Sequence, residues 1–306
     1  MFSSKRFIFA ILLCFISTAV SHSVALKYPR EIEVGNGKKI VLTKPPQRIV
    51  SFTLATDEIL SELVAPSRIQ AVTYLVDDPT VSNVTEWAKQ IPFHIHVDME
   101  QIVSREPDII FVASYTQAEI LEQLQSAQLP YVLFEAFGSI EEVEKNIMRV
   151  AEVVGEIDKG KELARRMKEK VALIDAKVKN SQSRPKVMSY APSGYTSGSH
   201  STVHELILRG GGRNVSAENG IEVGKKVSFE KVIEWNPDIL ILSGYMPGDE
   251  GFDQMLRSNP ALQNVNAVKN KKVIVVDGKY LTCVSQYIAD SLNAVTHAIH
   301  PELFKK

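Results

Sequence analysis

Short apolar runs and stretches of helical periodicity alternate along most of the chain. The apolar runs are typical of buried strands, and they occupy residues 48–52, 69–73, 109–112, 131–134, 186–190, 239–242 and 272–276. Helical spacing of apolar residues lies between them, most clearly over residues 117–127, 202–208 and 285–300. Strands that alternate with helices indicate βαβ units and a mostly parallel sheet. The pattern therefore predicts an α/β fold.

The middle of the chain departs from this alternation. Residues 139–180 contain no strand signal and no proline, and apolar residues recur at helical spacing from Leu163 through Val178. As a helix, the 23 residues from Asp158 to Asn180 would be about 34 Å long. We therefore expect one long helix between two α/β segments.

These patterns divide the chain into five segments. Residues 1–25 form a leader, and residues 26–47 form a hairpin around Asn36-Gly37, because alternating residues flank that turn dipeptide. Residues 48–138 form an N-terminal α/β lobe, whose first helix we expect Thr56 to cap and Leu63 to end. Residues 139–184 form a helical linker with the long helix, and residues 185–306 form a C-terminal α/β lobe.

The two lobes share an internal repeat. Residues 97–112 read VDMEQIVSREPDIIFV, and residues 227–242 read VSFEKVIEWNPDILIL. Five of sixteen positions are identical at an offset of 130, and most of the others match in type. Each copy predicts a cap (Asp98 or Ser228), a short helix, Pro-Asp and a buried strand. The repeat indicates two similar lobes on either side of the long helix.

Glu100 and Glu230 occupy the second helical position of the two copies. One such glutamate is ordinarily explained by its favourable interaction with the helix dipole. Two at equivalent positions, one in each lobe, suggest a paired surface feature. Two acidic side chains on one rim could bind two basic sites of a two-fold symmetric partner.

The first 25 residues are typical of a secretory signal peptide. Lys5 and Arg6 precede an apolar run from Phe7 to about Val20. Ser23-Val24-Ala25 then has the small residues typical of a signal-peptide cleavage site. An uncleaved anchor is the alternative, but the apolar run is short for a span of about 20 residues. Leu13 before Cys14 is too bulky for a lipid-attachment site. We therefore predict export to the periplasm.

Composition excludes several classes of protein. The chain is 44% hydrophobic and 23% charged with a formal charge of −1, which is globular and gives no basic surplus for nucleic acid. Only Cys283 would remain after processing, so neither an internal disulfide nor a thiolate metal cluster is expected. The segment GYTSG, residues 194–198, lacks the spacing of a nucleophile elbow. No catalytic set supports a secreted hydrolase, and we predict that the protein is not an enzyme.

Two histidine pairs leave a metal site open. His94 and His96 would lie on one face of a strand, and His200 and His204 would lie on one face at the start of a helix. Neither pair carries the glutamate of a metallohydrolase, and ordinary surface histidines explain both equally well. A bare zinc or manganese carrier that uses His94, His96 and His200 is an alternative hypothesis.

An ordered set of segments resembles a known family. The signal peptide, PPQRIVSFTLATDEILSEL, RIQAVTYLVDDP, MEQIVSREPDIIFV, the long helix and SFEKVIEWNPDILIL occur in the order found in class III periplasmic substrate-binding proteins of ABC importers. The resemblance covers about residues 46–304. It implies two Rossmann-like lobes with mostly parallel sheets, joined by a single rigid helix, with a ligand between them. It also implies a monomer that takes up iron–siderophore, haem or cobalamin, and a glutamate of each lobe, here Glu100 and Glu230, that pairs with arginines of the permease dimer.

The ligand site is expected beyond the carboxyl ends of the strands, where open α/β sheets bind ligands. These ends are rich in tyrosine and small polar residues and suit a large, flat, partly apolar ligand. They lack the arginines expected for an anionic catecholate, which favours cobalamin slightly over haem or a siderophore. A tyrosine or histidine there could be an axial ligand to iron or cobalt. The candidate ligand-binding residues are Thr53, Leu54, Tyr74, His94, His96, Tyr115, Tyr195, Tyr245 and Tyr280.

Overall fold

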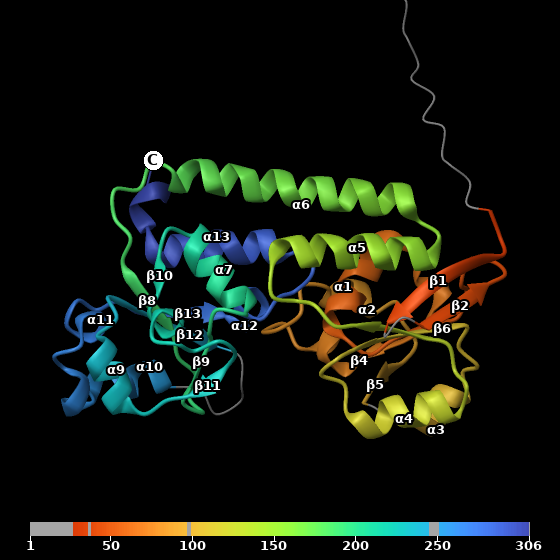
Figure 1. The fold of residues 1–306 in the computed structure, drawn as a ribbon, viewed down its shortest axis with the longest axis horizontal. Helices are drawn as coiled ribbons and strands as arrows, with labels where there is room; N and C mark the ends of the chain where they lie inside the picture. Colours follow the sequence, from red (N-terminus) through yellow and green to blue (C-terminus); the bar gives the residue numbers. More distant parts are fainter. Residues whose placement is uncertain (1–26, 36–37, 97–98, 245–250, 306) are drawn as a thin grey trace, which may run out of the picture.

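The computed structural model contains two α/β lobes side by side, with a long helix lying across both (Figure 1). It describes residues 27–35, 38–96, 99–244 and 251–305. The predicted signal peptide therefore lies outside the described residues. None of the helices in the described part of the chain is long and apolar enough to cross a membrane.

The N-terminal lobe is built on a five-stranded parallel sheet in the order β5-β4-β3-β6-β7. Its strands are β3 (Ile49–Ser51), β4 (Ile69–Thr73), β5 (His94–Ile95), β6 (Ile109–Ala113) and β7 (Tyr131–Phe134). Its helices are α1 (Leu54–Leu63), α2 (Thr85–Ala88), α3 (Met99–Val103) and α4 (Ala118–Ser126), with 3-10 turns η1 (Pro66–Arg68) and η2 (Tyr74–Asp77). The predicted hairpin precedes the lobe as β1 (Arg30–Gly35) and β2 (Lys38–Leu42).

The C-terminal lobe contains a four-stranded parallel sheet in the order β10-β8-β12-β13. These strands are β8 (Lys186–Ser189), β10 (Arg213–Asn214), β12 (Ile239–Gly244) and β13 (Val273–Asp277), and β9 (Tyr195–Thr196) pairs separately with β11 (Lys225–Lys226). The helices are α7 (Thr202–Arg209), α8 (Val215–Glu218), α9 (Phe229–Trp235), α10 (Phe252–Ser258), α11 (Asn266–Lys269), α12 (Gly278–Leu281) and α13 (Ile288–Ile299), with 3-10 turns η3 (Pro260–Leu262) and η4 (Pro301–Phe304). Every long strand predicted from an apolar run is present.

The long helix is α6 (Ile157–Val178), which follows α5 (Ile140–Val154). Its buried side chains form one apolar stripe, from Leu163 and Met167 through Val171 and Ile174 to Val178. The stripe packs on α5 beside the first lobe and on α13 beside the second (Figure 1). Buried residues of both lobes therefore belong to one continuous apolar cluster, and the prediction of a single connecting helix is confirmed.

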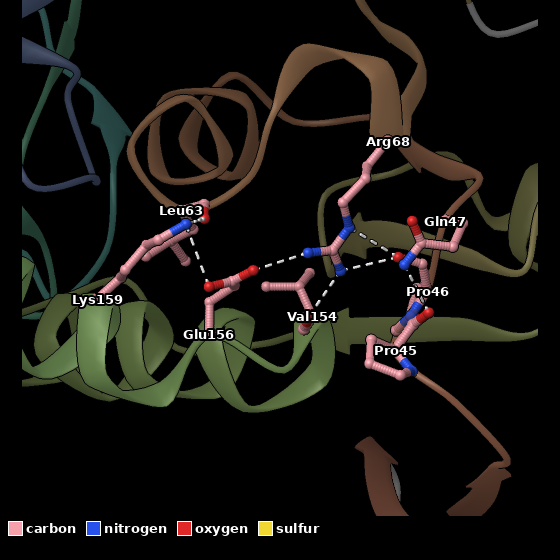
Figure 2. A network of polar contacts seen from close by, with 8 residues as sticks. All are labelled: Pro45, Pro46, Gln47, Leu63, Arg68, Val154, Glu156 and Lys159. Carbon is pink, nitrogen blue, oxygen red and sulfur yellow. Dashed lines mark hydrogen bonds and ion pairs between the residues drawn. The ribbon is translucent and has the colours of Figure 1, made fainter. Parts of the chain in front are cut away.

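A polar network fixes the start of α6 to the N-terminal lobe (Figure 2). Arg68, from η1, donates through Nε and Nη2 to the carbonyl oxygen of Pro46 at 2.9 and 2.8 Å, and through Nη2 to that of Val154 at 2.6 Å. Its Nη1 pairs with Glu156 at 2.9 Å. Lys159, one turn into α6, donates to the carbonyl oxygen of Leu63 at 2.8 Å. The guanidinium thus joins three segments that are distant in the sequence.

The cap of α1 differs from the prediction. Thr53, not Thr56, is the N-cap, because its hydroxyl accepts the backbone N–H of Thr56 at 3.1 Å and the helix already begins at Leu54. Thr56 is instead a buried member of the first turn, and its hydroxyl contacts those of Ser51 and Thr53.

We predict that Arg68→Ala lowers the free energy of unfolding by about 1–3 kcal/mol, because it leaves partly buried carbonyl oxygens without donors. Chemical denaturation measures this change. Arg165→Ala is the matched control, since Arg165 lies on the exposed face of α6 and pairs only with Glu162 and Glu169 of the same helix. Equal stability losses in the two variants would contradict the anchoring role of Arg68.

Candidate ligand-binding cleft

Each sheet has a point where the strand order reverses, and polar groups gather at both. In the N-terminal lobe the reversal lies between β3 and β6, and in the C-terminal lobe it lies between β8 and β12. Ligands of open α/β sheets bind outside the carboxyl ends of strands at such points. Thr53 and Tyr115 follow β3 and β6, and Tyr190 follows β8, while Ser243 lies near the end of β12.

Aromatic rings lie beyond the carboxyl ends of strands in the N-terminal lobe. Tyr115 is 63% exposed, and its ring packs against Phe137 with the centroids 5.6 Å apart. Tyr74, which is 45% exposed, stacks on His96 with the centroids 3.9 Å apart and an angle of 21° between the planes. Thr53 is buried as a helix cap, and Leu54 beside it is half-buried. Of the predicted residues in this lobe, Tyr74, His96 and Tyr115 present the most accessible surface.

His94 is held inside the lobe rather than presented to the cleft. Its Nδ1 lies 2.8 Å from the Asp77 carboxylate, and its Nε2 lies 3.0 Å from the carbonyl oxygen of Ala88. Each ring nitrogen therefore faces an acceptor oxygen of the same lobe. Neither nitrogen is left for a ligand in this arrangement, and His94 instead braces η2, the turn that carries Tyr74.

The C-terminal side holds a pocket of about 250 Å³. Tyr190 is buried, and its hydroxyl donates to the carbonyl oxygen of Val227 at 3.1 Å, so the pocket receives the ring rather than the hydroxyl. The Oγ of Ser243 is buried and has no hydrogen-bond partner among the described residues. Among the described residues, none that lines the pocket is charged; they are Ser189, Tyr190, Ala191, Tyr195, Thr196, Ser197, Val203, Gly224, Ile241, Ser243, Leu281 and Thr282.

The remaining predicted tyrosines of this lobe differ in position. Tyr195 is 52% exposed in β9 and lines the pocket. Tyr280, in α12, is half-buried, and the ammonium group of Lys279 lies 5.3 Å from the centre of its ring. Tyr245 lies outside the described residues.

A hydrogen-bonded seam joins the lobes beside this pocket. The buried carboxylate of Glu58, in α1, accepts from the hydroxyl of Ser285 at 2.5 Å and from the backbone and side-chain N–H groups of Asn83, each at 2.9 Å. Gln286 donates to the carbonyl oxygen of Glu58 at 2.7 Å, and the backbone N–H of Lys279 donates to that of Thr80 at 2.8 Å. Because Leu281 and Thr282 line the pocket, one short segment forms both the pocket wall and the seam.

Two adjacent acids are buried under the N-terminal side. Burial raises the pKa of Asp57 well above its ordinary value, and it also raises the pKa of Glu58, although the donors around Glu58 oppose the shift. One oxygen of Asp57 accepts the backbone N–H of Thr73 at 3.2 Å. The other has no partner among the described residues. The ends of β3 and β4 therefore rest on a carboxyl group that resists ionisation.

Glu100 and Glu230 lie at the second positions of α3 and α9, as predicted, and both are exposed. Hydrogen bonding by Ser228 lowers the pKa of Glu230, which keeps it ionised. In Figure 1, α3 and α9 lie in different lobes, both on the side of the molecule away from α6. Asp98, the predicted cap of the first copy, lies outside the described residues.

Comparison with known proteins identifies the architecture. A family model described as periplasmic binding protein matches residues 49–280. The chain belongs to the periplasmic binding protein family. It is a class III member, as the sequence resemblance predicted, with two Rossmann-like lobes and parallel sheets.

Two curated relatives cover most of this binding protein. An uncharacterized ABC transporter substrate-binding lipoprotein, YvrC of Bacillus subtilis, is 23% identical over 91% of this chain and 88% of its own. The vitamin B12-binding protein of Vibrio parahaemolyticus is 23% identical over 72% of this chain and 80% of its own.

Solved structures share the fold. The haem-binding protein RhuT from Roseiflexus superposes with a TM-score of 0.73, at 24% identity over 84% of this chain and 99% of its own. The molybdate-binding protein MolA from Haemophilus influenzae, bound to molybdate, superposes with a TM-score of 0.74, at 21% identity over 90% of this chain and 92% of its own. The family is thus one of transport-associated proteins whose members take different ligands.

The described histidines do not gather with other metal-ligating side chains into one group. Among the described residues, no group of three or more His, Cys, Asp and Glu side chains could hold a metal ion. His200 precedes α7 rather than sharing its first turn with His204, because Ser201 caps that helix by accepting the backbone N–H of His204 at 3.2 Å. The predicted helical pair of His200 and His204 is therefore wrong.

Sequence reasoning missed three groups in the binding protein. Phe137 follows β7, and the rule that places ligands beyond strand ends could have found it. Ser243 falls in a strand end that the prediction considered, but its lack of a partner could not be read from the sequence. The seam around Glu58 joins residues 227 positions apart, and no local pattern marks such a contact.

The buried acids predict an unusual pH dependence of stability. A folded-state pKa above the unfolded value means that folding takes up protons, so the free energy of unfolding should fall as pH rises above about 4. Asp57→Asn keeps the acceptor for Thr73 and removes one such group. In the variant, the free energy of unfolding should decline less steeply with pH, by up to about 1.4 kcal/mol per pH unit. The stability of the variant relative to the wild type should therefore increase toward neutral pH.

Urea denaturation of the two proteins between about pH 4 and pH 8 measures this difference. The range begins near the ordinary pKa of an aspartate, above which an unfolded chain loses the proton. Asp158→Asn, which changes an exposed carboxylate of α6, is the control and should leave the slope unchanged. A parallel pH profile for wild type and Asp57→Asn would show that Asp57 does not retain its proton in the fold.

Proposed function

We propose that this periplasmic binding protein captures a metal chelate between its lobes and delivers it to the transmembrane dimer of an ABC permease. The chelate we favour is cobalamin, ahead of haem or a ferric siderophore. The observation that carries this choice is the C-terminal pocket, whose described lining consists of tyrosines, small polar residues and aliphatic side chains without a charged group. An uncharged lining favours neutral amide groups over the carboxylates of haem or the charges of a catecholate.

The aromatic groups support a large and flat ligand. Tyr74 with His96 and Tyr115 with Phe137 offer ring surface on the N-terminal side, and Tyr190 and Tyr195 offer it on the other. Stacked rings bury a planar ligand efficiently. The vitamin B12-binding relative covers most of this chain and adds support. A bare zinc or manganese carrier has less support, because both nitrogens of His94 are occupied within the lobe.

The direct test is titration of the purified protein with cyanocobalamin, hemin, ferrichrome, Zn²⁺ and molybdate, read by absorbance and tryptophan fluorescence. We expect cyanocobalamin to bind most tightly. Ser243→Ala should weaken its binding about three- to tenfold, the usual effect of losing one hydrogen bond. Ser183→Ala, an exposed serine in the loop after α6, should have no effect. Preferential binding of Zn²⁺ or molybdate would overturn the chelate assignment.

Delivery depends in this proposal on Glu100 and Glu230. Both side chains are exposed, one on each lobe, and they could pair with basic side chains related by the two-fold axis of a permease dimer. Such pairs contribute to association and weaken at high salt. The protein would act as a monomer that bridges both halves of the permease.

We predict that the double variant Glu100→Ala, Glu230→Ala keeps its affinity for the chelate and loses most transport. Uptake into vesicles that contain the permease is measured beside equilibrium binding of cyanocobalamin. Transport by the wild type should fall as the salt concentration rises, because salt screens exposed charges. Normal uptake by the double variant, or loss of chelate binding instead, would refute the docking role.

Export completes the proposal. The predicted cleavage after Ala25 would release a free periplasmic protein, whereas the Bacillus relative is named a lipoprotein. Mass spectrometry of the mature protein distinguishes the two, since lipid on Cys14 would retain residues 14–25 and add acyl mass.

A further inference from the structure

The repeat aligns a second pair of exposed residues besides the two glutamates. At the offset of 130, Val103 corresponds to Ile233, and each follows its glutamate by three positions. Val103 is 47% exposed at the end of α3, and Ile233 is 41% exposed in α9. Residues three apart on a helix lie on the same face, so each lobe shows a carboxylate beside a β-branched apolar side chain.

The exposure of these two residues is selective within their helices. Ile102, next to Val103, is 0% exposed, and Val232, next to Ile233, is 1% exposed. Each short helix therefore already has a buried apolar face, made by Ile102 in α3 and by Val232 and Trp235 in α9. Single exposed apolar residues are common on protein surfaces. Two exposed apolar residues at equivalent positions of a repeat, each beside an equivalent glutamate, indicate a shared function.

Val103 also lies at the edge of an open groove of about 930 Å³ between α3 and α4. The groove has apolar sides from Met99, Val103 and Ala127. Among the described residues that line it, every charged one is a glutamate, namely Glu100, Glu119 and Glu122. Arg105, the nearest arginine in sequence, lies over the ring of Phe93 at 3.7 Å and bonds to the carbonyl oxygen of Gln101.

We propose that Val103 and Ile233 are docking residues, and that each lobe binds the permease through a glutamate together with an apolar contact. The occupant of each site is a periplasm-facing segment of the permease that carries a basic side chain beside an apolar one. This inference rests on the proposed delivery function. The groove beside Val103 adds two further carboxylates, Glu119 and Glu122, to the acidic surface of the N-terminal lobe.

Charge decides against a second copy of this chain as the occupant. A two-fold contact through the groove would bring the glutamates of both copies together, and like charges at an interface oppose association. A basic partner instead finds opposite charge and an apolar surface at the same place. Each permease half presents an equivalent segment, which matches the equivalence of the two sites in the repeat.

The test measures docking of the chelate-free protein on the permease in lipid nanodiscs by biolayer interferometry. The variants are Val103→Ser, Ile233→Ser, their combination, and the pair Glu100→Ala with Glu230→Ala. Each serine variant should raise Kd about threefold and the combination about tenfold, because each removes buried apolar area at the contact. Leu173→Ser is the control: Leu173 is 68% exposed, but it lies on α6 at the opposite side.

Salt separates the apolar contribution from the charged one. The effect of the serine variants should persist between about 0.05 and 0.5 M salt, whereas the effect of the alanine variants should shrink. Val103→Ile should bind as the wild type does. Wild-type docking by the double serine variant, with impaired docking by the double alanine variant, would overturn this inference and leave the delivery function standing. Wild-type docking by both would overturn the two together, and a change of oligomeric state in the serine variants would assign the patch to self-association instead.

Discussion

The architecture depends on the apolar stripe of α6. Half of the residues of this helix are charged, yet Leu163, Met167, Val171, Ile174 and Val178 form one buried face that packs on α5 and α13. Because the stripe is shared, residues of both lobes belong to one apolar cluster. Bending the helix would break its hydrogen-bond ladder and expose that face. We therefore expect the lobes to keep a nearly constant relation, with the cleft formed before a ligand arrives.

The polar contacts between the lobes depend on that constant relation. Glu58 is buried, and a buried carboxylate is costly unless donors surround it. Asn83 supplies such donors from the same lobe and Ser285 supplies one from the other lobe, and Ser285 reaches Glu58 only when the lobes keep this distance. The same segment continues into the pocket wall at Leu281 and Thr282. The position of the pocket relative to the N-terminal aromatics is therefore set by the packing of α6 and by the seam together.

In the proposed function, binding and delivery use different surfaces of this frame. The aromatic rings and the unpartnered hydroxyl of Ser243 lie at the carboxyl ends of the strands, where both sheets reverse their order. The glutamates and their apolar neighbours lie on α3 and α9, on the outer surface away from α6. A rigid frame allows the cleft to vary among family members while the outer surface keeps its spacing. The range of ligands among the relatives, from vitamin B12 to molybdate, accords with such a separation.

Local patterns in the sequence determined the elements, because burial of strands and helix stripes leaves a regular spacing of apolar residues. The strands of both lobes, the hairpin, the single long helix and the helical positions of Glu100 and Glu230 followed from such spacing.

The cap of α1 and the histidine pair of α7 were misplaced, since Thr53 and Ser201 compete with neighbours of similar chemistry for the same backbone donors. Which side chains face the cleft remains a prediction for most of the named residues, although the structure shows that His94 is occupied by Asp77 and Ala88. The seam around Glu58, the anchoring of α6 by Arg68 and the burial of the Ser243 hydroxyl without a partner among the described residues were decided by tertiary structure alone. Each depends on groups brought together from distant parts of the chain, and the spacing of neighbouring residues carries no record of such contacts.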